Sequence, residues 1–78
     1  MGKITVKFTD TTAGVSRLHR VEGNPNFTVV VARIIRRVLG EQAARNREDG
    51  PVRQGGYGQP ALDTTVNGRT YRVVKVQR

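Results

Sequence analysis

The first residues of the chain alternate between polar and apolar side chains. Ile4, Val6 and Phe8 are separated by Lys or Thr, and this period of two is typical of a strand with one buried face. We therefore predict a strand over residues 3–9. Residues 10–14 are small and polar and end in Gly, which predicts a turn.

A second strand is predicted over residues 15–22, although its pattern is less regular. Leu18 falls on the face opposite Val15 and Val21, which suggests a bulge or a local twist at that point. Residues 23–26, with the sequence Gly-Asn-Pro-Asn, then interrupt the regular structure.

The central segment predicts one helix over residues 25–44. Asn24 is expected to cap it, and Pro25 to take the first helical position, where a missing N–H is harmless. The β-branched residues near its start would also suit a strand. The helical period, however, gathers the apolar residues on one face: Phe27, Val30, Val31, Ile34, Ile35 and Val38. The opposite face would carry Arg33, Arg36, Arg37 and Arg47.

Residues 46–60 differ in composition from the rest of the chain. This segment contains four Gly and two Pro and few apolar side chains. A stretch of this length without secondary structure is uncommon inside a compact domain unless it is functional or disordered. We expect a flexible loop here.

The C-terminal part predicts a β-hairpin of residues 61–66 and 69–76. Asn67 and Gly68 between the two runs supply the two positive φ angles of a type I′ turn. That turn sets the register of the predicted pairs, which are Val66 with Arg69, Thr65 with Thr70, Thr64 with Tyr71, Asp63 with Arg72, and Leu62 with Val73.

The end of this hairpin carries apolar residues on its second face. Val74 and Val76 fall on the same face as Asp63 and Arg72, which predicts a bulge or burial on both faces. The C-terminal strand could pair edge to edge with a second copy of the chain, or bury this face against one, so a homodimer is one expectation.

Together these elements predict an α+β fold of the order β-β-α-β-β, in which a four-stranded antiparallel sheet packs against one helix. We expect residues 1–78 to form a single small basic domain, with the flexible loop at 46–60. The predicted core consists of Ile4, Val6, Phe8, Val21, Phe27, Val31, Ile34, Ile35, Val38, Leu62, Tyr71 and Val73.

Charge and composition narrow the class of protein. The 14 Lys and Arg residues exceed the 6 Asp and Glu residues, and the formal net charge is +8. The chain has no apolar run long enough to span a membrane, and its start does not have the pattern of a secretory signal. It also has no Cys, which excludes disulfides, thiolate metal sites and Cys catalysis. We expect a cytoplasmic protein without membrane contact.

The excess of Arg points to a polyanionic partner. Arginine binds phosphate groups in a bidentate manner and stacks on bases, and each neutralised phosphate adds affinity through counterion release. We expect non-enzymatic binding of DNA or RNA through the outer face of the helix and the C-terminal hairpin. The residues predicted for this contact are Arg33, Arg36, Arg37, Arg69, Arg72 and Lys75, with Arg53 and Tyr57 from the loop.

The uncovered face of the sheet is a second candidate surface. It would carry Lys3, Thr5, Lys7, Arg20 and Arg72. Proteins that bind single strands use such faces with stacking aromatic residues, but only Tyr57 is not predicted to be buried. The sequence therefore favours backbone contact, reading of duplex shape, or insertion of the helix into a groove. The loop would either place Arg53 on a phosphate and Tyr57 on a base or serve as a passive connector.

No set of catalytic or metal-binding residues is recognisable. His19 is the only histidine, the carboxylates lack the spacing of a divalent-metal site, and no phosphate-binding Gly motif occurs. We expect no metal and no cofactor. One alternative is a small basic ribonuclease of the toxin type, in which Arg69, Tyr71, Arg72 and Lys75 would stabilise charge on a phosphate. Another is a small regulatory or inhibitory protein, of the phage or plasmid kind, that binds an acidic protein.

Overall fold

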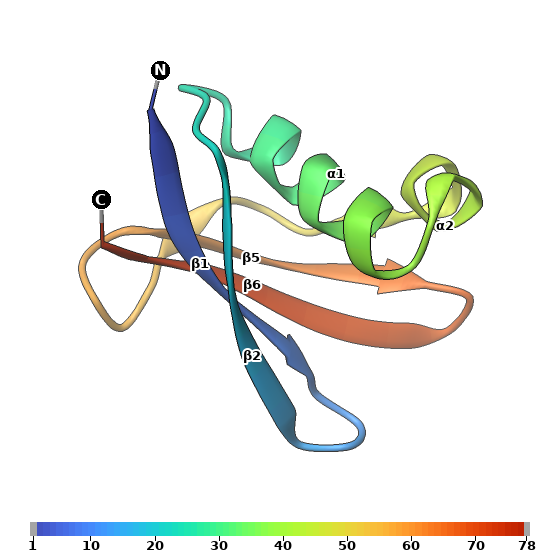
Figure 1. The fold of residues 1–78 in the computed structure, drawn as a ribbon. Helices are drawn as coiled ribbons and strands as arrows, with labels where there is room; N and C mark the ends of the chain where they lie inside the picture. Colours follow the sequence, from blue (N-terminus) through green and yellow to red (C-terminus); the bar gives the residue numbers. More distant parts are fainter. Residues whose placement is uncertain (1, 78) are drawn as a thin grey trace.

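Within residues 2–77, which the computed structural model describes, six strands form one antiparallel sheet and two helices cover one of its faces (Figure 1). The four long strands are β1 (Lys3–Asp10), β2 (Val15–Glu22), β5 (Pro60–Val66) and β6 (Arg69–Gln77). The other elements are the short strands β3 (Glu48–Asp49) and β4 (Arg53–Gln54) and the helices α1 (Phe27–Val38) and α2 (Glu41–Asn46).

The strand order is β2-β1-β6-β5-β3, and β4 also pairs with β5. The expected α+β class and the four long strands are confirmed, whereas the count of four strands and one helix is too low. β6 lies between β1 and β5 and pairs with both. The expected edge-to-edge pairing of the C-terminal strand with a second copy is therefore wrong, because both of its edges are already occupied.

The hairpin of β5 and β6 has the predicted register at every pair from Val66 with Arg69 to Leu62 with Val73. Asn67 and Gly68 have φ angles of 51° and 79°, as a type I′ turn requires. The expected irregularity near the C-terminus is confirmed as well. The pairing of β1 with β6 shifts between Thr5 and Val6.

The second strand has the predicted bounds, but it has no bulge. Its pairing with β1 runs without a shift from Asp10 with Val15 to Lys3 with Glu22. Leu18 simply lies on the uncovered face of the sheet, where 64% of it is exposed. The irregular pattern in the sequence therefore reflects an exposed leucine and not a change of register.

The predicted single helix is shorter and broken in two. Asn26, not Asn24, is the N-cap of α1, and its side chain accepts a hydrogen bond from the Thr28 N–H at 3.1 Å. Gly40 has a φ of 103° and donates to the Ile35 carbonyl, which ends α1 before α2 begins. Val38, near this break, is 41% exposed and does not belong to the core. Neither helix in the described part of the chain could cross a membrane.

The core lies between the helices and one face of the sheet. The rings of Phe8 and Tyr71 stack there with centroids 5.2 Å apart. Of the predicted core residues, Val38 is exposed and Ile4 is only partly buried against the core. The other predicted residues all belong to the core. The buried residues that complete it are Val30, Ala44 and Val66.

Residues 46–60 contain more structure than the sequence predicts. β3 and β4 in this segment each pair with β5. Arg47, which the helical pattern placed on an outer face, is only 20% exposed at its side chain. Its guanidinium group donates to Asp49 at 3.0 Å, to the Ala44 carbonyl at 2.6 Å and to the Thr28 carbonyl at 3.3 Å. Arg47 thus ties this segment to both helices.

We expect Gly68→Ala to lower the free energy of unfolding by about 1 kcal/mol or more, because a Cβ is unfavourable at a positive φ. Gly56→Ala is the matched control, since the structure leaves open space at Gly56 and its φ is not positive. Urea denaturation measures both. Equal stability of the two variants would contradict the turn assignment.

Arg47→Ala should lower the free energy of unfolding by about 1–3 kcal/mol, because it leaves partly buried acceptors without their donor. Arg45→Ala removes a side chain that is 71% exposed and pairs with Glu41 at 3.3 Å. That control should change stability by no more than about 0.5 kcal/mol. A similar effect of both substitutions in thermal unfolding would show that Arg47 is only a surface charge.

Candidate nucleic-acid interface

The register of the strands separates the side chains of the sheet into two faces. One face is covered by the helices, and the other, which we call the open face, has no helix over it (Figure 1). Alternation along each strand places the polar residues of β1 on the open face, opposite the buried Val6 and Phe8. Cationic side chains predominate on this face: Lys3, Lys7, Arg20, Arg53 and Arg72 lie there, against Glu22, Glu48 and Asp63.

A tight turn over residues 55–59 lies on one end of the open face. The Gly55 N–H donates to the Gln59 carbonyl at 2.6 Å, and Gly58 has a φ of 73° and donates to the Gly55 carbonyl. A Cβ at Gly55 would lie 2.9 Å from Val74 Cγ1. Glycine is therefore required at this position by close packing, and the turn buries Val74 although that residue is on the open face.

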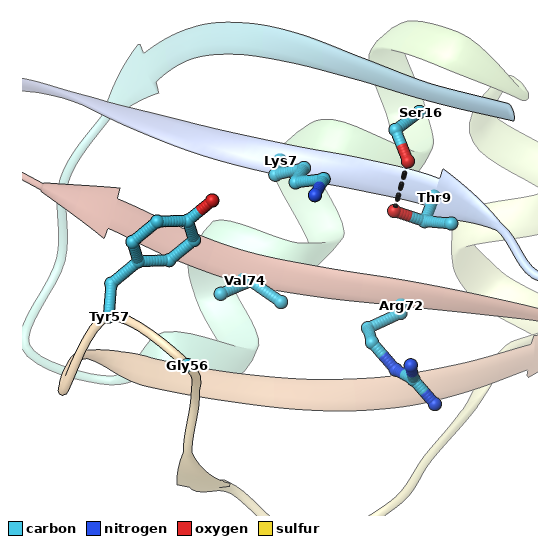
Figure 2. Close-up of a pocket in the computed structure, with 7 residues that line it drawn as sticks. All are labelled: Lys7, Thr9, Ser16, Gly56, Tyr57, Arg72 and Val74. Atoms are coloured by element: carbon cyan, nitrogen blue, oxygen red, sulfur yellow. Dashed lines mark hydrogen bonds between the residues drawn. The ribbon is translucent and has the colours of Figure 1, made fainter.

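Tyr57 at the tip of this turn remains 52% exposed. Figure 2 shows its ring extending over the sheet toward Lys7, with Val74 beside it and Arg72 further along. These residues line a hollow of about 550 Å³ together with Thr9, Ser16 and Gly56. The hydroxyl groups of Thr9 and Ser16 are hydrogen-bonded to each other at 2.8 Å. The hollow thus combines one exposed aromatic ring, two cationic groups and two hydroxyl groups.

The cationic groups of the open face differ in their partners. Arg72 donates to Asp63 at 3.0 Å, and Arg53 approaches the same carboxylate at 3.4 Å. The hydrogen bond from Arg72 lowers the pKa of Asp63, and the positive charge of Arg53 lowers it further. Two guanidinium groups share one carboxylate, so this cluster keeps a net positive charge. Lys7 has no carboxylate within salt-bridge distance among the described residues.

The predicted helix arginines do not form one outward surface. Arg33 donates to the Glu22 carbonyl at 3.0 Å, and Arg37 donates to the Arg20 carbonyl at 2.8 Å. Arg36 forms an ion pair with Glu41 at 2.6 Å, and this contact lowers the pKa of Glu41. Arg33 and Arg37 thus lie against the edge of the sheet, and the charge of Arg36 is partly neutralised by Glu41.

The predicted residues of the C-terminal hairpin are also divided between faces. Arg69 lies on the helix side, where it pairs with Asp10 at 3.0 Å, and Lys75 lies near the start of α1 beside Pro25 and Phe27. Of the eight predicted binding residues, only three lie together on the open face: Arg53, Tyr57 and Arg72. Lys7, Thr9 and Ser16 join them, and the polar positions of the alternating N-terminal strands were the signal for these residues.

The four residues considered for ribonuclease chemistry are not brought together either. Tyr71 is buried against Phe8, Arg72 lies on the open face, and Lys75 lies at the far end of the helix side. No group of three His, Asp or Glu residues in the described part of the chain could hold a metal ion. No protein-family model, curated protein or solved structure matches the chain.

The ion pairs of this surface should give the protein an acid-sensitive stability. The pKa of Asp63 is lowered on folding, so its contribution to stability is present above the ordinary Asp pKa of about 3.9 and is lost as the pH falls through the lower folded value. Asp63→Asn and Arg72→Met should each flatten the fall of the unfolding free energy below about pH 4. Chemical denaturation at several pH values tests this, and an unchanged pH dependence in both variants would contradict the pairing.

Proposed function

We propose that the protein binds single-stranded nucleic acid on the open face of its sheet. The observation that carries this proposal is Tyr57, a half-exposed ring held by a tight turn over a cationic sheet surface. Stacking of a base on an aromatic ring and contact of phosphates with Lys and Arg are the two interactions that such binding needs. Both are available within one hollow.

The charge distribution supports this face over the outer face of α1. A helix that enters a duplex groove presents side chains that are free to reach bases and phosphates. Arg33 and Arg37 instead donate to backbone carbonyls of β2, and Arg36 is engaged by Glu41. Lys7 and Arg72 lie with Tyr57 on an uncovered surface (Figure 2), and although Arg72 also pairs with Asp63, it shares that carboxylate with Arg53.

The single exposed ring also limits the mode of binding. Phe8, Phe27 and Tyr71 are buried in the core, so one base at a time can stack on Tyr57. The remaining contacts are to the sugar–phosphate backbone, which carries no direct sequence information. We therefore expect weak sequence preference and a strong dependence of affinity on salt.

Tyr57→Ala should weaken binding to a single-stranded DNA or RNA oligonucleotide roughly fivefold or more, because it removes the stacking surface. Tyr57→Phe keeps the ring and should retain the affinity. Fluorescence anisotropy at about 50 mM salt gives these values. Equal affinities of the Ala and Phe variants would remove Tyr57 from the interface.

Two cation variants separate the two candidate faces. Lys7→Gln should reduce the slope of log affinity against log salt by roughly 0.7, the value for one phosphate of a single strand. Arg36→Gln, on the helix layer, should leave the slope unchanged. A reduced slope for the Arg36 variant alone, or tighter binding of duplex than of single strands, would favour the helix face and overturn the proposal.

A further inference from the structure

The outer edge of β2 is the one long edge of the sheet to which no strand within residues 2–77 pairs. Successive residues of an antiparallel strand alternately direct their backbone groups toward and away from the partner strand. The Gly23 N–H donates to the Gly2 carbonyl at 3.0 Å, so counting back assigns the outward direction to Glu22, Arg20, Leu18 and Ser16. These residues present backbone N–H and C=O groups at the open edge.

Two arginines of α1 cover half of this edge. Arg33 donates to the outward carbonyl of Glu22 and Arg37 to that of Arg20. The next outward-directed residues along β2 are Leu18 and Ser16. No side chain of the described residues donates to their outward carbonyls. The edge is therefore closed near the start of α1 and open over the half that leads to the 11–14 turn. An open edge is the usual site at which an extended peptide adds a strand.

An apolar groove lies beside the open half of the edge. It has a volume of about 300 Å³, with the rings of Phe8 and Tyr71 in its floor and Val15, Val38 and Leu39 around it. The three aliphatic residues are exposed by 55%, 41% and 37%, in that order.

Leu18 and His19 belong to the same corner of the molecule. Leu18, on the opposite side of the same strand, is 64% exposed. His19 contributes a buried Nε2 that has no hydrogen-bond partner among the described residues. Three exposed aliphatic side chains thus line the groove on the helix side, with Leu18 on the open face of the same strand and the buried Nε2 of His19 nearby.

The charge around the groove indicates what would occupy it. Arg17 and Asp10 both line the groove, and the Asp10 carboxylate already pairs with Arg69 at 3.0 Å. Burial lowers the pKa of His19 in the groove, and the positive charges of Arg37 and Arg17 lower it further. Two copies joined at this edge would bring these guanidinium groups and Arg20 of each copy together. Such juxtaposed like charges oppose a dimer, whereas carboxylates on an added strand would be attracted.

We propose that the open half of β2 binds an extended acidic peptide segment of another protein by strand addition. The added segment pairs with the backbone of Ser16 and Leu18, places an apolar side chain in the groove beside Val15 and Leu39, and directs acidic side chains toward Arg17 and Arg37. This site adjoins the hollow around Lys7 and Tyr57 and shares one residue with it, since the Ser16 side chain lines the hollow. The added strand uses the outward backbone groups of Ser16 and the groove on the helix side of the sheet.

A peptide of about ten residues that alternates Val and Glu is a suitable probe, since it has the length of a long strand. Isothermal titration calorimetry should detect binding of this peptide. A peptide of the same length that alternates Val and Lys should bind with an affinity lower by about tenfold or more. The Val and Glu peptide with every amide N-methylated should not bind, because it cannot donate to the edge. Comparable binding of either control would overturn the proposal, and neither comparison requires an altered protein.

Leu18→Pro removes the outward N–H at the centre of the open edge without touching the bonds to β1. It should abolish peptide binding, whereas Leu18→Thr, which keeps the N–H, should retain most of it. Thermal unfolding verifies that both variants are folded. Unchanged binding in the folded Pro variant would contradict strand addition. Sedimentation tests the other occupant. If the unaltered protein dimerises with rising concentration and the Pro variant does not, a second copy occupies the edge and the proposal is overturned.

Discussion

Both helices lie on the same face of the sheet, and this one-sided cover determines what each residue of the strands can do. The covered face must be apolar, because it packs around the stacked rings of Phe8 and Tyr71. The other face carries Lys, Arg, Thr and Ser at the alternate positions. A polar sheet face that no element covers is available to a partner, and in this chain its charge is positive.

The arginines show why a count of charges does not locate a binding surface. Guanidinium groups bind carbonyls and carboxylates of their own chain as well as phosphates. Here Arg33 and Arg37 bind two backbone carbonyls of an edge strand, and Arg47 joins α1, α2 and the segment after them. What matters for binding is the charge left over after these contacts, and much of it lies on the open face and along β2.

Local patterns were sufficient for much of the fold. The Asn67–Gly68 turn fixed the register of the hairpin because its φ angles allow few alternatives, and simple alternation identified β1. The break at Gly40 was missed because Gly is tolerated inside helical patterns, and the residues after it, Glu41 to Ala44, also favour a helix.

The candidate site was harder to predict because it depends on contacts between distant segments. β3 and β4 are too short for any periodicity, and their pairing with β5 is set by tertiary structure. The sequence predicts Tyr57 and Arg72 as binding residues, and the structure places both at the open face. The partners of the helix arginines become visible only when α1 is placed against β2. Lys7 joins the candidate site for the same reason, because only the tertiary structure places it beside Tyr57 in the hollow.

The most direct test of this account is a backbone NMR titration of the protein with a single-stranded oligonucleotide. The account predicts that the largest chemical-shift changes fall on the open face and its turn, at Lys7, Thr9, Tyr57 and Arg72. Changes concentrated on α1 around Arg33, Arg36 and Arg37, with the open face unaffected, would contradict it.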